Sequence, residues 1–255
     1  MSLAVGWLPE TAFFYLLIFA RVGSVLMLMP ALGEQAINAR SRLSFALVFA
    51  LVLHPLLAPS LPPQPATLPE ILMLLLHEVA VGLIIGAMAR IVVTSAMVAG
   101  SIIAFQVGLS VAQMADPTQG GVQGAVFGSF MSLLGITLIF ATDLHHLALA
   151  AIYDSYLVFT PTEPLMLDDM AQMVIGVVSN AFRVGLQMSA PFIVFGLVFN
   201  LGSGILARLM PQLQVYYLLM PANVFSGLIL FALLLVMMMG LYLMSFENHL
   251  AALRR

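Results

Sequence analysis

The fold is decided by a long apolar stretch, LPEILMLLLHEVAVGLIIGAMARIVVTSAMVAGSIIAFQVGLSVAQM, which covers residues 68–114. A helix rises 1.5 Å per residue, so this stretch would extend about 70 Å as one helix. The hydrocarbon core of a bilayer is only about 30 Å thick. We therefore expect the stretch either to bend back on itself or to leave the lipid.

Apolar runs of the same kind fill the rest of the chain. Short segments rich in proline, glycine and charged residues separate them, and no internal repeat is visible. These runs are residues 12–32, 43–57, 122–140, 147–159, 168–209 and 215–244. The pattern predicts an all-α membrane protein with six to eight spans and a single domain over residues 1–255.

The composition excludes several classes of protein. Residues of the set AVILMFWYC make up 62% of the 255 residues, and only 7% are charged, with eight Arg or Lys and eleven Asp or Glu. This excludes a soluble monomer and a disordered chain. A net charge of −3 argues against nucleic acid as a partner. The absence of cysteine excludes disulfides and thiolate metal sites. Because the first ten residues contain no Lys or Arg, we expect a retained first helix and not a secretory signal.

Five charged residues lie in or beside the apolar runs. They are Arg21, Glu78, Arg90, Arg183 and Arg208. A charge at the bilayer centre costs about 2.5–3.5 kcal/mol on insertion scales, so each is expected to face protein or water. Two readings stay open: helix–helix salt bridges or snorkelling, and a water-filled path or a protein interface.

Glycine patterns mark further positions. Gly82 with Gly86, and Gly124 with Gly128, are GxxxG pairs that favour close packing against another helix. The segment Asn200–Gly204 reads as a helix break, either a turn between two helices or a site where backbone groups coordinate an ion.

Catalytic and metal-binding motifs are weak. Asp143, His145, His146 and Asp154 form a group of possible metal ligands, for which a loop or helix-cap role is the favoured reading. No His-Glu-x-x-His motif, nucleophile elbow, Walker motif or dinucleotide fingerprint occurs. The sequence therefore predicts no enzyme, no cofactor and no metal.

Four stretches carry a family resemblance. They are Met29-Pro-Ala-Leu-Gly33 with Asn38-Ala-Arg-Ser-Arg42 and His54-Pro55, then Glu78 to Gly86 with Gly100 and Gln106-Val-Gly-Leu-Ser110, then Asp116-Pro117 with Gly120-Gly121, and finally Asn200 to Gln212 with Pro221. In this order and spacing they resemble the FliR/SctT family of type III secretion export-gate proteins, in its flagellar branch. The resemblance covers about residues 10–245.

The resemblance implies a structural subunit of the flagellar export gate. In that family the subunit joins FliP and FliQ, near FlhB and FlhA, in the bacterial inner membrane at the flagellar basal body. Its helical hairpins pack with homologous partner subunits around a conduit for unfolded flagellar proteins. The five charged residues would then lie at helix or subunit interfaces.

The resemblance also implies a plug-like gating loop over residues 106–124. Its candidate residues are Gln106, Val107, Gly108, Leu109, Val111, Met114, Asp116, Pro117, Gly120 and Gly121. The prolines and glycines favour a loop, and the apolar residues could pack as a stopper. An ordinary exposed turn is the alternative.

Two other functions compete with the export gate. A secondary transporter would use Glu78 and Arg90 near its site and the Asn200–Gly204 break for an ion, but repeated halves are missing. An intramembrane hydrolase lacks its catalytic spacing.

Overall fold

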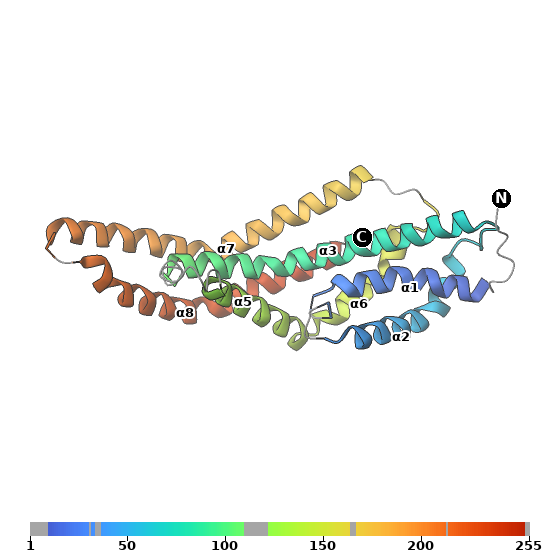
Figure 1. The fold of residues 1–255 in the computed structure, drawn as a ribbon, viewed down its shortest axis with the longest axis horizontal. Coiled ribbons are helices and arrows are strands. Elements are labelled where there is room, and N and C mark those ends of the chain that lie inside the picture. The colour runs from blue at the N-terminus through green and yellow to red at the C-terminus, as the bar shows by residue number, and fades with distance from the viewer. Residues whose placement is uncertain are drawn as a thin grey trace. The chain divides into compact units, whose positions relative to one another are not determined.

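The computed structural model describes residues 10–30, 32–33, 37–109, 122–163, 167–212 and 214–252 (Figure 1). Its elements are α1 (Glu10–Leu28), α2 (Ala39–Leu57), the 3-10 helix η1 (Ala58–Ser60), α3 (Leu68–Gln106), α5 (Val122–Ala141), α6 (Leu144–Val158), α7 (Leu167–Leu209) and α8 (Val215–Ala252). Within these ranges every regular element is a helix, which confirms the all-α prediction.

Among the described residues, five helices are long and apolar enough to cross a membrane. They are α1, α2 (with η1), α3, α7 and α8, and α5 with α6 would count as one further, bent span. The predicted count of six to eight therefore agrees with the structure only at six. The described residues supply no further span by length and composition, because the long apolar runs are kept as single helices.

The helix α3 settles how the stretch that begins at Leu68 folds. It continues unbroken for 39 residues, which is about 58 Å at 1.5 Å per residue. Of the two expected alternatives, the bend back is absent over residues 68–106. The helix is longer than the hydrocarbon core is thick, and the alternative that it leaves the lipid stays a prediction. The helix ends in a Schellman motif, with Gly108 at φ 86° and the Leu109 amide donating to the Ala104 carbonyl at 3.0 Å.

The chain forms two compact units, and the long helices contribute to both. The first unit contains α1, α2 and α6, α3 as far as Ile91, α7 as far as Val178, and α8 from Glu247. The second contains α5 and the remaining parts of α3, α7 and α8. The division into units describes contacts in the folded chain and does not test whether each unit folds by itself. The expectation of a single domain therefore stays a prediction.

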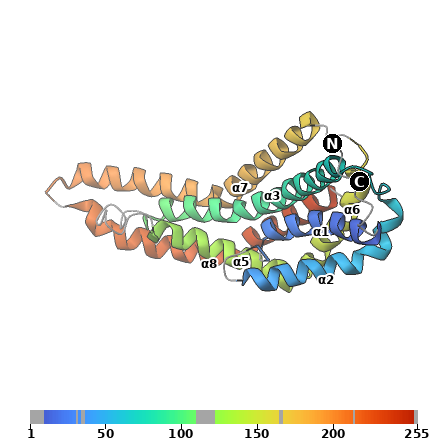
Figure 2. The same ribbon diagram turned by 45° about the vertical axis from the view of Figure 1, so that its right-hand side comes forward.

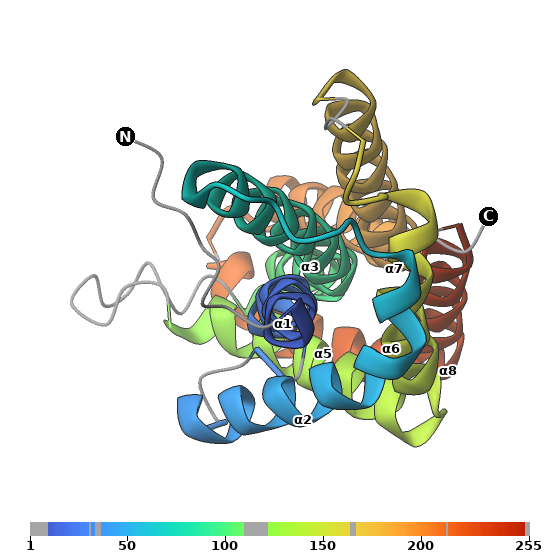
Figure 3. The same ribbon diagram turned by 90° about the vertical axis from the view of Figure 1, so that its right-hand side faces the viewer.

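The first unit is built around α1. Figure 3 looks along this helix and shows α2, the first part of α3, and α6 around it. Phe13, Leu17, Ile18 and Val22 of α1 are fully buried. Each Å² of apolar surface that they bury stabilises the fold by about 25 cal/mol. These residues therefore hold α1 against its neighbouring helices.

The second unit packs α5, α7 and α8 against the end of α3. Figure 2 shows α7 and α8 as an antiparallel hairpin. The ring centre of Phe231 on α8 lies 4.8 Å from that of Phe127 on α5 and 6.4 Å from that of Phe192 on α7. Gly100 and Gly128 let α3 and α5 approach closely, since a Cβ on Gly100 would lie 2.8 Å from the Gly128 Cα.

The expected break at Asn200–Gly204 is absent, because these residues are helical within α7. Gly202 and Gly204 face open space, and the Ser203 hydroxyl donates to the Asn200 carbonyl of its own helix at 2.9 Å. Both readings of this segment, a turn and an ion-coordinating break, were therefore wrong. The helix ends instead at Leu209, just before Pro211. The transporter hypothesis thereby loses the feature on which its ion site depended.

Candidate functional site

The most buried polar group of the first unit is an ion pair between α1 and α3. Arg21 and Glu78 are both fully buried. The Arg21 Nε donates to Glu78 Oε2 at 2.7 Å, and Nη2 donates to Oε1 at 2.8 Å. This is the bidentate geometry in which guanidinium and carboxylate bind each other most strongly.

The same guanidinium also binds the end of α6. Its Nη1 donates to the Ser155 carbonyl at 3.0 Å and lies 3.5 Å from the Ser155 hydroxyl, and Nη2 donates to the Phe159 carbonyl at 2.8 Å. These carbonyls lie at the helix C-terminus, where a cation is favoured. The Tyr156 ring lies 3.9 Å below the guanidinium carbon. One buried side chain thus ties α1, α3 and α6 together through four hydrogen bonds of 2.7–3.0 Å.

A glycine notch brings α1 and α3 close enough for this contact. A Cβ on Gly82 would meet the Ser24 hydroxyl and lie 2.6 Å from the Arg21 carbonyl, and one on Gly86 would lie 2.9 Å from the Val25 carbonyl. The close packing predicted for this GxxxG pair is confirmed, and its partner is a helix of the same chain.

The other three embedded charges have a different environment. Arg90, Arg183 and Arg208 are all exposed on their helices. They therefore do not join the buried cluster around Arg21, and their placement at subunit interfaces stays a prediction.

The first four residues of the candidate gating loop are described. Val107 is buried, and a Cβ on Gly227 of α8 would lie 2.5 Å from its Cγ1. The Gln106 side chain lies against Gly196 of α7, and Gly108 lies against the Asn223 amide of α8. The end of α3 is therefore seated between α7 and α8 by glycine positions on both helices.

The remaining loop candidates lie outside the described residues. They are Val111, Met114, Asp116, Pro117, Gly120 and Gly121.

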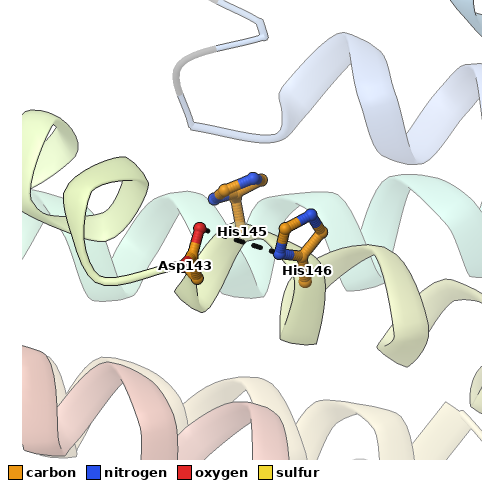
Figure 4. A group of neighbouring side chains, drawn as sticks. All are labelled: Asp143, His145 and His146. Atoms are coloured by element: carbon orange, nitrogen blue, oxygen red, sulfur yellow. Dashed lines mark ion pairs between the residues drawn. The ribbon is translucent and has the colours of Figure 1, made fainter.

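Three of the four possible metal ligands come together at the start of α6. Figure 4 shows Asp143, His145 and His146, whose ligand atoms all lie within 4.8 Å of one another. Asp154 is not part of this group. Asp143 occupies the N-cap position with φ 60° and ψ 11°, but its side chain makes no capping hydrogen bond. Of the loop or helix-cap role that the sequence favoured, the position is confirmed, because Asp143 lies in the turn at the N-cap, but its carboxylate makes no capping hydrogen bond.

Long apolar faces are exposed on α7 and α8, and the sequence did not identify which residues would form them. On α7 the large apolar residues with more than half of their surface exposed are Ile175, Phe182, Leu186, Val194, Leu197, Val198, Leu201, Ile205 and Leu209. On α8 they are Tyr217, Leu218, Phe225, Leu233, Val236, Met237 and Met244. Their spacing alone could not reveal which side would stay uncovered, because apolar residues continue along the whole length of both helices.

The chain is similar to known export proteins over most of its length. Residues 12–249 match the family described as bacterial export proteins, family 1. The chain is 47% identical over 217 residues to the flagellar biosynthetic protein FliR of Caulobacter vibrioides, which covers 85% of this chain and 86% of that protein. It is 30% identical to FliR of Bacillus subtilis, covering 82% and 81% of the two chains, and 27% identical to FliR of Escherichia coli, covering 84% and 81%.

Proposed function

The chain belongs to the bacterial export proteins, family 1, and to the FliR proteins within it, and on that basis we propose that it is a structural subunit of the flagellar type III export gate. Membership makes it a membrane-embedded component of the flagellar export apparatus. The finer proposal is that it forms, with FliP and FliQ, the conduit through which unfolded flagellar proteins leave the cell. In this role it sits in the inner membrane at the basal body, near FlhB and FlhA, and carries out no catalytic step.

The observation that supports partner subunits is the length of the exposed apolar face on α7. This face runs from Ile175 to Leu209, which is about 51 Å along a helix. Transmembrane helices tilt by about 0–40°, and the hydrocarbon core is about 30 Å thick. At the largest of these tilts a 51 Å face still exceeds the core. The hydrocarbon core can therefore cover only part of it, and we propose that partner subunits cover the remainder.

The exposed arginines agree with such partners. Arg183 and Arg208 lie on the same helix as this apolar face. A charge beside an extended apolar surface is tolerated where it meets water or a polar group of another subunit. We propose that partner subunits supply such groups.

The gating loop is part of the same proposal. We propose that residues 106–124 form the plug-like loop of the conduit, seated at its base by Val107 in the notch of Gly227. Deleting residues 115–121 is expected to raise leakage of small ions while the complex still assembles. An assembled complex with unchanged leakage would remove the plug from the proposal.

The decisive experiment is native mass spectrometry of the full chain after co-expression with FliP and FliQ of the same organism. We expect one large complex that contains this chain together with both partners. A monomer or homodimer, accompanied by FliP assembled without it, would overturn the proposal. Each partner is also expressed without this chain, which shows whether the mass of the complex depends on it.

A further inference from the structure

The group of three side chains at the start of α6 has no role in the export gate as proposed above. We propose that Asp143, His145 and His146 form a binding site for one divalent transition-metal ion of the zinc class. The site lies wholly within the first unit. The proposal concerns metal binding alone, so its test is independent of the proposed export function.

The backbone explains why these three side chains converge. Asp143 is in the left-handed region at φ 60°, which is uncommon for a residue other than glycine. Its carbonyl accepts a hydrogen bond from the His146 amide at 3.0 Å. This turn places the Asp143 Oδ1 3.9 Å from the His146 Nδ1, and the two imidazole rings lie with their centres 4.1 Å apart (Figure 4).

The Asp143 side chain makes neither a helix cap nor a strong ion pair. The Asp143 side chain does not cap the helix. An ion pair with His146 contributes little, because 78% of the Asp143 side chain and 71% of the His146 side chain are exposed. The closest approach, 3.9 Å, is also too long for a hydrogen bond. Two imidazole nitrogens and a carboxylate oxygen nevertheless face one another.

This donor set selects the metal. Imidazole suits Zn²⁺, Ni²⁺ and Cu²⁺, whereas Mg²⁺ and Ca²⁺ prefer oxygen ligands alone. Around a tetrahedral Zn²⁺ with ligand bonds of about 2.0–2.1 Å, donor atoms lie about 3.4 Å apart. The donor atoms of the three side chains now lie within 4.8 Å of one another. Rotation of the exposed Asp143 and His146 side chains would bring these atoms to the spacing that Zn²⁺ requires. Water would complete the coordination.

The rest of the chain offers little competition for such an ion. It contains no cysteine and five histidines in all. Two of the five lie in this group. Of the others, His77 lies beside Glu78, whose carboxylate is held by Arg21.

The test is a Zn²⁺ titration of the full chain, purified in detergent with an affinity tag free of histidine. We expect isothermal calorimetry to give one Zn²⁺ per chain. His146→Ala and Asp143→Asn should each weaken binding more than about tenfold, because even the loss of a group behind a ligand costs 10–100-fold. His54→Ala, which removes a histidine from α2, is the matched control and should bind as the wild type does.

Two safeguards keep the result interpretable. Asparagine tolerates the left-handed backbone, so Asp143→Asn keeps the turn while it removes the charge. Circular dichroism of each variant checks that the helices are intact.

Absorption spectra with Co²⁺ in place of Zn²⁺ should show the bands of a site with nitrogen and oxygen ligands. The absence of one-to-one binding would overturn the proposal, as would equal binding by His146→Ala and His54→Ala.

Discussion

Gly82 of α3 lies so close to Ser24 of α1 that a single methyl group at position 82 would overlap the serine hydroxyl. That hydroxyl is itself fixed, since it donates to the carbonyls of Ala20 at 2.8 Å and Arg21 at 2.9 Å. The helix backbones of α1 and α3 therefore approach closely at Gly82, one turn away from the buried Arg21–Glu78 pair, and again at Gly86. Several expected outcomes depend on this contact and on the ion pair beside it.

Replacing Gly82 by alanine should push α1 and α3 apart. We expect Gly82→Ala to lower stability by about 1–3 kcal/mol, as overpacking of a filled interior does. Gly202→Ala on α7 is the control, because a Cβ there would meet nothing within 4 Å. It should be neutral or stabilising by up to about 1 kcal/mol, since alanine favours helix over glycine. The apparent Tm of the detergent-solubilised chain measures both effects. Equal shifts in Tm would contradict the close packing of α1 against α3 at Gly82.

Removing one member of the buried ion pair should be costly. Arg21→Met leaves the Glu78 carboxylate buried without its counter-ion, and we expect a loss of about 3–5 kcal/mol in stability. Exposed Arg183 provides the control, Arg183→Met, which should change the Tm little. A small effect of Arg21→Met, similar to that of the control, would show that the pair is not needed.

The double variant separates the charge from the hydrogen bonds. Arg21→Met with Glu78→Met removes both charges, so part of the stability lost in Arg21→Met should return. Recovery should stay incomplete, because the carbonyls of Ser155 and Phe159 still lose their donors. Full recovery would mean that these carbonyls find other partners.

A methyl group on Gly227 should unseat the end of α3. In Gly227→Ala the new Cβ would lie 2.5–3.0 Å from side-chain atoms of Val107, so Val107 must move. If residues 106–124 close the conduit, ion leakage through the assembled complex should rise. Gly240→Ala, on the same helix and with nothing within 4 Å of its Cβ, should leave leakage unchanged. Equal leakage in the two variants would argue that the seat of Val107 does not control closure.

A charge on the apolar face of α7 should block assembly. Leu201 is 61% exposed, and Leu201→Glu would bury a carboxylate if a partner helix covers this position. We expect incorporation into the complex with FliP and FliQ to fall more than about tenfold, equivalent to about 1.4 kcal/mol. Gln187→Glu adds the same charge at an exposed polar position of the same helix and should assemble normally. Native mass spectrometry of the co-expressed proteins measures both, and normal assembly of Leu201→Glu would place the partner elsewhere.

The helices themselves were largely predictable from the sequence. The run predicted at residues 168–209 differs from α7 by one residue, because two aspartates begin it and Pro211 follows its end. The run that begins at Val215 was expected to end at Met244, but α8 continues to Ala252. The polar residues Glu247, Asn248 and His249 turned out to be helical, since polarity alone does not end a helix.

The contacts between helices were much less predictable. Arg21 and Glu78 are separated by 57 residues, and each charge was visible in the sequence without any local signal of its partner. Asn200–Gly204 was misread because glycine was taken as a breaker, although glycine is frequent within transmembrane helices. The group at Asp143 was recognised, but its geometry depends on a left-handed backbone that the sequence does not encode in a recognisable pattern.

The partners of Arg21 lie far from it in the chain, and this affects how α1 packs while the protein is being synthesised. Glu78 follows Arg21 by 57 residues in the chain, and Phe159 follows it by 138. At about 5–20 residues per second of translation, the carboxylate emerges roughly 3–11 s after the guanidinium and the last carbonyl roughly 7–28 s after it. Until these partners emerge, α1 carries an unpaired cation, which costs about 2.5–3.5 kcal/mol at a bilayer centre on insertion scales. We therefore expect α1 to reach its final packing only after the end of α6 has been synthesised.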